Sequence, residues 1–382
     1  MHRLRVALVA GRADPALDGV ADYTDHLGGA LRAAGVDVAD VPVDPGPHGT
    51  ARAARRVRAV APDVVHVQFA PSAFGFSAAP GLLPDLLPRP TPLVTTLHEY
   101  GWWSWAPRVP AAVWRPLECA GRLDRESGRL VVRSAAVLTT NDDHDRALRA
   151  RLGVVARRAP LLPNVAVDPD APPRAEVRRR LGIPPDAEVV VFFGFVHPVK
   201  GLRYLVDAVA TLAAERPRLH LLVVGGFTSL ALPADEAAAF RAELTAHVDA
   251  SGAAERVTVT GHRPAAEVSA ALQAADVAAF PFTAGVTAKS GSLLAAFDHG
   301  LPTLVTRAAG ATPDPLLTDG ATVVVAEGVR DPDVLVTGLR RLLGDADLRA
   351  RVAAGGRDVM RGHSWAALAA THHAIYREVA GR

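Results

Sequence analysis

The segment VVFFGFVHPVKGLRYLVDAV, residues 190–209, joins an apolar run to an amphipathic pattern through a short polar loop. The continuous apolar run is typical of a strand that is buried on both faces. After the loop, apolar residues recur at spacings of three and four, which predicts a helix with one inward face. These residues are Leu202, Leu205, Val206, Val209 and Leu212. The segment therefore predicts a strand–loop–helix unit of a parallel sheet.

The same alternation recurs along the whole chain. The first half predicts strands at residues 5–11, 64–69, 92–98, 135–141 and 159–164. The second half predicts strands at residues 189–195, 219–226, 257–261, 276–282, 302–306 and 322–328. Buried runs separated by helical patterns predict an α/β protein with two Rossmann-like, doubly wound parallel sheets. Two such domains facing each other would form a central cleft at the carboxyl ends of their strands, where ligands of such sheets bind.

The length and composition of the chain limit the classes of protein it belongs to. At 382 residues it exceeds the size at which a single core keeps growing. A segment rich in proline and charge, residues 165–188, predicts a linker with a domain boundary near residue 170. The net charge of +2, from 42 basic and 40 acidic residues, argues against a nucleic-acid partner.

Cysteine content and hydropathy bear on location. Cys119 is the single cysteine, which excludes an intramolecular disulfide and fits a reducing compartment. The apolar run at residues 5–11 is too short for a signal peptide, and no stretch reaches the ~20 residues that span a bilayer. We therefore expect a cytoplasmic protein whose membrane contact is at most peripheral, and the oligomeric state stays open.

Two loops have the composition of a phosphate site. Lys200 and Gly201 follow the strand at residues 189–195, and a lysine with nearby helix amides suits a diphosphate. The second loop, Lys289-Ser290-Gly291-Ser292, precedes an Ala/Leu pattern, so the amides of residues 290–293 would face an anion at a helix N-terminus. The structural alternatives are a solvated Lys200 and a serine that only caps its helix.

Motifs along nearly the whole chain resemble one family. They are GFVHPVKG (194–201), VTGHRPAAEVSAALQAADVAAFPF (259–282), SLLAAFDHGLPTLVT (292–306), DGVADYTDHLGGALRAAGVDV (18–38), TTLHEY (95–100) and SWAALAATHHAIYREV (364–379). In order and spacing they resemble the retaining family 4 glycosyltransferases (glycosyl transferases group 1) of the GT-B fold. The resemblance implies an acceptor-binding domain at 1–169, a nucleotide-sugar-binding domain at 170–363 and a C-terminal helix at 364–382 that packs back on the first domain.

The same resemblance implies an activity. The protein would transfer a sugar with retention from a nucleotide diphosphate sugar, UDP favoured over GDP, to a hydroxyl of a small polar, saccharide or natural-product acceptor. The donor is a co-substrate, and neither a cofactor nor a metal is implied. His98 would contact the transferred sugar, and Lys200 would neutralise the leaving diphosphate. The remaining donor contacts implied are Gly19, Val20, Gly194, His262, Arg263, Thr287, Lys289, Ser290, Gly291, Ser292 and Leu293.

The sequence departs from the family pattern at three positions. Phe195 stands where the family often has an arginine, and Thr287 and Ala295 stand where it commonly has two glutamates. Lys289 would restore the missing positive charge from the second loop. The departures leave open an altered donor, a nucleotide-sugar-binding protein without transfer, or a related epimerase or pseudo-glycosyltransferase. A Rossmann oxidoreductase is disfavoured because VAGRADPALDGV, residues 9–20, lacks the glycine fingerprint.

Further polar and aromatic residues are candidates for the acceptor side. Glu99 follows His98 at a strand end and is a candidate base or contact for the acceptor hydroxyl. Trp102 and Trp103, with Trp105, form either an acceptor platform or a packed or membrane-facing loop. Asp22 is a candidate acceptor contact or a surface residue.

One apparent metal motif has a simpler explanation. Asp143-His144-Asp145 matches the Asp-x-Asp metal motif of a different glycosyltransferase fold. Because Asn141 or Asp142 would cap a helix there, acids in its first turn are expected without a metal.

Overall fold

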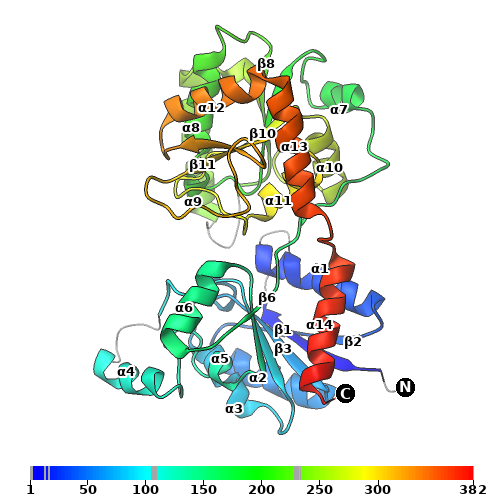
Figure 1. The fold of residues 1–382 in the computed structure, drawn as a ribbon, viewed down its shortest axis with the longest axis vertical. Helices are drawn as coiled ribbons and strands as arrows, with labels where there is room; N and C mark the ends of the chain where they lie inside the picture. The colour runs from blue at the N-terminus through cyan, green and yellow to red at the C-terminus, as the bar shows by residue number, and fades with distance from the viewer. Residues whose placement is uncertain are drawn as a thin grey trace. The chain divides into compact units, whose positions relative to one another are not determined.

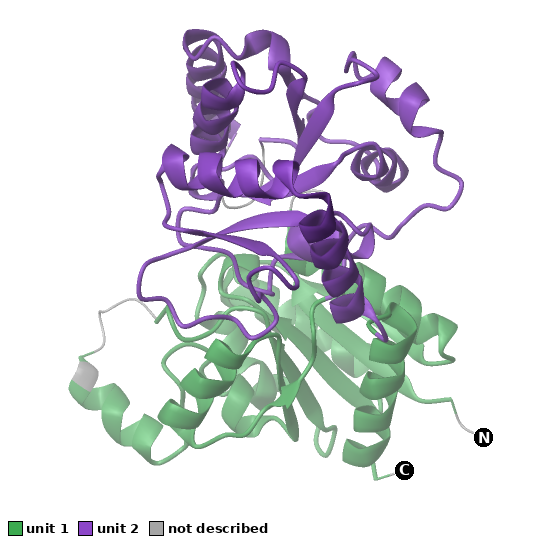
Figure 2. Ribbon diagram, turned by 45° about the horizontal axis from the view of Figure 1, so that its top comes forward, with its two compact units in different colours: residues 1–161, 363–382 green, residues 162–362 purple. Residues whose placement is uncertain are grey.

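The computed structural model describes residues 3–12, 14–15, 18–104, 110–227, 232 and 234–381. The chain forms two compact units, coloured separately in Figure 2: unit 1 is residues 1–161 with 363–382, and unit 2 is residues 162–362. The sequence placed the first boundary at 169/170. In the structure the preceding residues are tied to unit 2, where the Asp168 amide donates to Oγ of Ser269 at 2.8 Å.

Unit 1 contains a six-stranded parallel sheet in the order β2-β1-β3-β4-β5-β6. Its strands are β1 (Arg5–Gly11), β2 (Asp37–Val43), β3 (Val64–Phe69), β4 (Leu93–Leu97), β5 (Ala136–Thr139) and β6 (Arg157–Arg158). The predicted strand at residues 159–164 is wrong, because pairing with β5 ends at β6 and Pro160 and Pro163 lack the N–H that a ladder needs. Strand β2 was not predicted.

Seven α-helices accompany this sheet in the part of unit 1 that the structure describes. They are α1 (Gly19–Ala33), α2 (Gly46–Val60), α3 (Leu83–Leu86), α4 (Ala111–Cys119), α5 (Leu130–Arg133), α6 (Asp142–Leu152) and α14 (Trp365–Val379). Figure 1 shows α14, in red, beside α1, in blue. The ring of Trp365 lies 5.2 Å from that of Tyr23 and stacks 5.1 Å from that of His26. The C-terminal helix therefore belongs to the first unit, as predicted.

Unit 2 contains a second six-stranded parallel sheet in the order β12-β11-β10-β7-β8-β9. Its strands are β7 (Glu188–Phe193), β8 (Leu219–Val224), β9 (Val257–Val259), β10 (Val277–Phe280), β11 (Thr303–Arg307) and β12 (Val324–Glu327). Its α-helices are α7 (Arg174–Arg180), α8 (Leu202–Leu212), α9 (Ala234–Ala250), α10 (Ala265–Gln273), α11 (Gly291–Asp298), α12 (Pro332–Gly344) and α13 (Ala346–Met360). All six strands predicted for the second half are present. The five apolar residues predicted to face inward on α8 are buried.

The strand order of unit 2 indicates where a ligand would bind. From β7 the chain moves outward through β8 and β9, and it then returns to the other side of β7 for β10 and β11. Neighbouring strands β7 and β10 therefore form a topological switch point, with the loops that follow them at one edge of the sheet. Ligands of such sheets bind at the carboxyl ends of the strands at this point. The loop after β7 carries Lys200 and the loop after β10 carries Lys289, so these are the two loops that the sequence predicted as phosphate sites.

Candidate functional site

Glycines let three backbone segments approach closely at the switch point. Gly194, directly after β7, has φ of +135°, and a Cβ there would lie 2.7 Å from Oγ of Ser292. A Cβ on Gly225, after β8, would lie 1.9 Å from the carbonyl oxygen of Gly194. The φ of both residues, +135° at Gly194 and +150° at Gly225, is one that other residues rarely adopt, and at Gly225 the clash would be with backbone, so both positions require glycine. The structure thus brings together Gly194 and Ser292, two residues that the family resemblance assigned to donor binding.

The loops after β7 and β10 are bonded to each other. The amide and the hydroxyl of Thr283 both donate to the carbonyl oxygen of Val199, at 2.9 and 3.1 Å. Gly201 has φ of +68°, and a Cβ there would lie 2.0 Å from the carbonyl oxygen of Pro281. The position of Lys200, between Val199 and Gly201, is therefore fixed from both sides.

Lys200 packs its charge against an aromatic face. Its Nζ lies 3.7 Å from the centre of the Phe282 ring, a cation–π contact. Burial lowers the pKa of Lys200 to about 8, and the charge of Lys289 acts in the same direction. Lys200 and Lys289 are also the chain's only two lysines. An anion placed here would meet two cations and favour the charged form of Lys200.

The second predicted loop leads into α11. Ser290 is the N-cap, and its Oγ accepts the amide of Leu293 at 3.3 Å. The capping role left open by the sequence is thus confirmed for Ser290. Among the described residues, no hydrogen bond engages the amides of Gly291 and Ser292. These N–H groups lie at the positive end of the helix, where an anion is stabilised.

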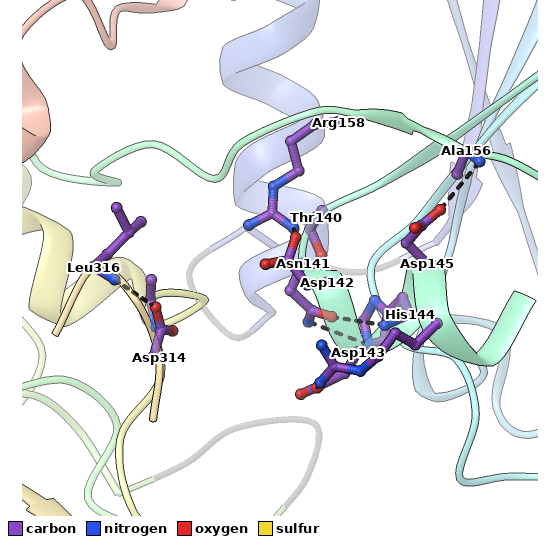
Figure 3. A network of polar contacts seen from close by, with 12 residues as sticks. Thr140, Asn141, Asp142, Asp143, His144, Asp145, Ala156, Arg158, Asp314 and Leu316 are labelled. Carbon is purple, nitrogen blue, oxygen red and sulfur yellow. Dashed lines mark hydrogen bonds and ion pairs between the residues drawn. The ribbon is translucent and has the colours of Figure 1, made fainter. Parts of the chain in front are cut away.

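Thr287 stands at one of the positions where the family pattern has a glutamate. It borders a shallow, open hollow that Ala308 and Asp314 also line. The carboxylate of Asp314 accepts the amides of Ala288 at 2.8 Å and Leu316 at 3.0 Å, and Figure 3 shows the second contact. An acid on the loop after β11 therefore supports the loop in which Thr287 lies. No local pattern in the sequence points to Asp314, because it lies 27 residues further along the chain than Thr287.

His262 and Arg263 follow β9. His262 is exposed. A Cβ added at Gly226 would lie 3.4 Å from the Cβ of His262, so the segments that follow β8 and β9 are adjacent. Arg263 donates from Nε to the carbonyl oxygen of Thr260 at 3.1 Å and lies 3.5 Å from Glu267. Its guanidinium is therefore held by its own loop and helix, and its role in donor binding stays a prediction.

Gly19 and Val20, two of the implied donor contacts, are the first two residues of helix α1. Asp18 is the N-cap, and its carboxylate accepts the amides of Val20 at 3.0 Å and Ala21 at 2.7 Å. Burial raises the pKa of Asp18, whereas its amide partners lower it. Gly19 is exposed, while Val20 packs partly against the core of unit 1. A donor phosphate would therefore meet a helix end that already holds a carboxylate.

Asp22 lies on the first turn of α1 and pairs with His26. Their Oδ1 and Nδ1 atoms are 3.3 Å apart. This contact raises the pKa of His26 to about 9, although partial burial opposes it. The Asp22 carboxylate thus already has a cationic partner within its own helix, and its contact with an acceptor stays a prediction.

His98 follows β4 and is held from three sides. Its Nε2 lies 2.7 Å from Oε1 of Gln68, its amide donates to the carbonyl oxygen of Phe69 at 2.8 Å, and the Tyr23 ring meets its edge at 4.8 Å. Burial lowers the pKa of His98 to about 3, so the imidazole is neutral near pH 7. The next residue, Glu99, accepts a hydrogen bond from the hydroxyl of Ser72 at 2.9 Å.

A buried carboxylate anchors the loop that carries Trp102 and Trp103. Glu126 accepts the amides of Gly101 at 2.7 Å, Trp102 at 3.1 Å and Trp103 at 2.7 Å, and it also pairs with Arg151. Burial raises the pKa of Glu126, while these amides and Arg151 act in the opposite direction. Sequence reasoning missed Glu126, because no local pattern links it to amides more than 20 residues earlier.

The anchored loop presents aromatic rings to solvent. Trp102 is 60% exposed and Phe76 is 51% exposed, well above the exposure of packed aromatics. Their ring centres lie 6.1 Å apart, and those of Phe76 and Trp103 lie 6.2 Å apart. Phe76 extends the predicted platform and was not foreseen. Trp105 lies outside the described residues.

The apparent metal motif is a helix cap, as predicted. Figure 3 shows Asn141 at the start of α6, where its Oδ1 accepts the amide of His144 at 2.9 Å. Asp142 pairs with Arg158 at 3.2 Å. In the described part of the chain, no group of three or more His, Cys, Asp or Glu residues is placed to hold a metal ion. None of the described helices is long and apolar enough to cross a membrane.

The two units have the architecture of the GT-B fold, and solved structures agree. A protein from Anabaena, HepE, crystallised with UDP and glucose, superimposes with a TM-score of 0.71 at 15% identity, covering 98% of this chain and 100% of that one. A family model described as glycosyl transferases group 1 matches residues 187–345.

Two curated D-inositol 3-phosphate glycosyltransferases align with more than half of the chain. The one from Xylanimonas cellulosilytica is 30% identical over 300 residues, 76% of this chain and 67% of that protein. The one from Kineococcus radiotolerans is 31% identical over 275 residues, 68% of this chain and 60% of that protein. A 2-deoxystreptamine glucosyltransferase from Streptomyces kanamyceticus is 32% identical over 181 residues, 44% of each chain. The chain belongs to the glycosyl transferases of group 1.

Proposed function

We propose that the protein transfers a sugar from a nucleotide diphosphate sugar, a UDP-sugar in preference to a GDP-sugar, to a hydroxyl of a small polar, saccharide or natural-product acceptor. Unit 2 binds the donor and unit 1 supplies the acceptor contacts. The observation that carries the proposal is the grouping of Lys200, Lys289 and the α11 N-terminus at the switch point of unit 2. Two cations and free amides there suit a diphosphate.

The donor diphosphate is the leaving group in this scheme. Lys200 and the amides of Gly291 and Ser292 are oriented before the reaction begins, so they stabilise the developing negative charge without reorganisation. Transfer proceeds with retention. The bond between the anomeric carbon and the diphosphate oxygen breaks while the acceptor oxygen bonds to the same face of the sugar. The acceptor proton passes to a diphosphate oxygen, so the step uses no protein nucleophile.

Residues of unit 1 contact the sugar and the acceptor. Neutral His98 accepts a hydrogen bond from a hydroxyl of the transferred sugar, because its low pKa keeps a lone pair on the ring near pH 7. Glu99 binds the acceptor hydroxyl. Trp102 and Trp103, with Phe76, offer aromatic faces on which a sugar or cyclitol ring stacks.

The similar proteins support the substrate classes without defining them. The Anabaena neighbour holds UDP and glucose. The curated relatives are named for acceptors that are cyclitols, namely D-inositol 3-phosphate and 2-deoxystreptamine. We therefore propose a polar cyclitol or saccharide as the acceptor.

Product formation tests the proposal. The protein would be incubated with UDP-, GDP- and ADP-glucose and a panel of cyclitols and saccharides, with and without a chelator, and products detected by mass spectrometry. We expect a glycosylated product with a UDP-sugar that is unaffected by the chelator and is lost in Lys200→Ala. NMR of the product would give the anomeric configuration, and inversion would contradict the retaining scheme.

Thr287 and Ala295 favour one alternative function, nucleotide-sugar binding without transfer, because both replace the glutamates of the family pattern. Donor binding without product across the panel would support this alternative. A donor epimerised in the absence of acceptor would instead indicate an epimerase.

A further inference from the structure

A chain of buried polar side chains leads from His98 into the core of unit 1. Gln68 and His66 lie two residues apart on β3, so their side chains lie on the same face of the sheet. Both are fully buried, as are Thr96 on β4 and Tyr376 on α14. The apolar appearance of β3 in the sequence concealed these two polar residues. A buried polar residue without partners is costly, so the hydrogen bonds of this group define what it does.

Continuous contacts connect these four buried side chains to one another and to His98. Oε1 of Gln68 lies 2.7 Å from Nε2 of His98, and Nε2 of Gln68 lies 3.1 Å from Nε2 of His66. Nδ1 of His66 lies 2.6 Å from the hydroxyl oxygen of Tyr376. Thr96 places Oγ1 2.8 Å from Nε2 of His66. The C-terminal helix is therefore linked to His98 through two side chains of β3.

The hydrogen-bonding capacity of each group assigns the protons. The amide oxygen of Gln68 can only accept, so Nε2 of His98 carries the proton between them. The amide nitrogen of Gln68 donates, so Nε2 of His66 presents a lone pair. The remaining proton of His66 is then on Nδ1, which donates to the oxygen of Tyr376. Burial lowers the pKa of both His66 and His98, in agreement with neutral rings.

We infer that Gln68 is a positioning residue, itself oriented by His66 and Tyr376, that holds His98 in the tautomer with the proton on Nε2. This tautomer leaves a lone pair on Nδ1, and no hydrogen bond within the described residues engages that atom. Resting on the proposed function, the inference assigns Nδ1 as the atom that accepts from a hydroxyl of the transferred sugar. With the proton on Nδ1, His98 could only donate there, and it would then favour a different substrate group.

The tautomer can be measured without any substrate. The protein would be produced with histidine labelled with ¹⁵N in the ring, and long-range ¹H–¹⁵N correlation spectra would be recorded at neutral pH. Comparison with the His98→Asn variant identifies the His98 signals among those of the 14 histidines. The pattern of couplings then shows directly which ring nitrogen bears the proton.

Three variants separate positioning from general destabilisation. Gln68→Leu removes the acceptor, and we expect His98 to show the other tautomer or a mixture. Gln68→Glu keeps an acceptor oxygen at the same reach and should retain the proton on Nε2. Thr95→Val is the matched control, because Thr95 is buried on the same strand as Thr96 but bonds Ser134 at 2.9 Å, outside the chain of contacts. Its His98 signals should match those of the wild type.

The tautomer measurements test the positioning of His98 separately from the proposed sugar transfer. If every donor and acceptor in this chain of contacts were exchanged, His98 of the wild type would carry its proton on Nδ1. Observing that tautomer would overturn the inference. An unchanged tautomer in a folded Gln68→Leu protein also overturns it. If Gln68→Leu does not fold, Gln68→Glu and Tyr376→Phe still report: Tyr376→Phe removes the acceptor of the His66 proton and should shift the His66 and His98 signals. Absence of sugar transfer, with the tautomer as expected, would contradict the proposed function and leave the positioning intact.

Discussion

The ammonium of Lys200 lies 3.7 Å from the centre of the Phe282 ring, at the point where the loops after β7 and β10 meet. Burial there lowers the pKa of Lys200 to about 8, below its ordinary value of 10.5. The folded protein without a ligand therefore holds this charge in an unfavourable place. A bound diphosphate would reverse the preference, because a neighbouring anion favours the ammonium.

Replacing Lys200 by methionine should stabilise the protein and remove its activity. Between pH 8 and 10.5 the unfolded chain binds more protons at Lys200 than the folded one, so the stability of the wild type rises with pH across this window. Below it the cost of the buried charge is fully present, on the order of 1–3 kcal/mol. We expect Lys200→Met to unfold at higher urea concentration at neutral pH, while turnover falls on the order of 10²-fold or more.

Lys289→Met is the control for this experiment, because Lys289 is exposed and its removal should change the free energy of unfolding by less than about 0.5 kcal/mol. A Lys200→Met protein that is both less stable and fully active would show that the charge serves packing only.

Alanine at Gly201 should separate the two loops of the proposed donor site. Gly201 has φ of +68°, and a Cβ would lie 2.0 Å from the carbonyl oxygen of Pro281. Gly252 offers a matched control, with φ of +72° and no atom within 4 Å of its Cβ position. Gly252→Ala should cost about 1–2 kcal/mol from the left-handed backbone alone. Gly201→Ala should cost about 1–3 kcal/mol more and weaken donor binding, measured by urea unfolding and calorimetry. Equal effects of the two variants would exclude a close contact of the loops.

Removing the Glu126 carboxylate should free the loop that carries Trp102 and Trp103. Because Glu126 accepts three amides and pairs with Arg151 inside the protein, Glu126→Ala should cost about 3–5 kcal/mol. Asp143→Ala removes an exposed ion pair with Arg146 and should cost less than about 1 kcal/mol. We also expect Glu126→Ala to raise the KM for the acceptor and leave that for the donor unchanged. A similar cost for both variants would contradict this account.

The pair of His26 and Asp22 predicts a pH dependence of stability. The pKa of His26 is raised from 6.5 to about 9, so its contribution is fully present below pH 6.5 and is lost as the pH rises through about 9. The difference in unfolding free energy between the wild type and His26→Gln should therefore shrink across this window. Asp22→Asn should abolish the pH dependence. A constant difference from pH 6 to 10 would show that the pair is not formed in solution.

Much of unit 2 could be predicted because its inner strands, β7, β8, β10 and β11, are buried on both faces, which leaves uninterrupted apolar runs in the sequence. Strand β2 was missed for the opposite reason: it lies at an edge of its sheet, and its first four residues are not buried. The strand predicted at residues 159–164 is absent. Its apolar residues suggested a buried strand, but Pro160 and Pro163 cannot donate the hydrogen bonds that a strand needs.

The two loops of the proposed donor site could be located in the sequence because each carries a lysine, a glycine and a helix start. Glu126 and Phe76 could not, because each acts on residues that are distant in sequence. The same holds for Gln68 and Tyr376, which lie 308 positions apart and are connected through His66. Such contacts are set by the fold, and no local pattern of residue types reveals them.

The central claim, that Lys200 holds the donor diphosphate, can be tested through the NMR signal of Lys200 itself. Lysine labelled with ¹³C at Cε would give two resonances, since the chain has two lysines, and Lys289→Arg would assign them. Without nucleotide, the Lys200 resonance should titrate with a pKa of about 8. Saturating UDP should shift that resonance and raise its pKa, whereas uridine should do neither. An unchanged shift and titration of Lys200 in the presence of UDP would contradict the account.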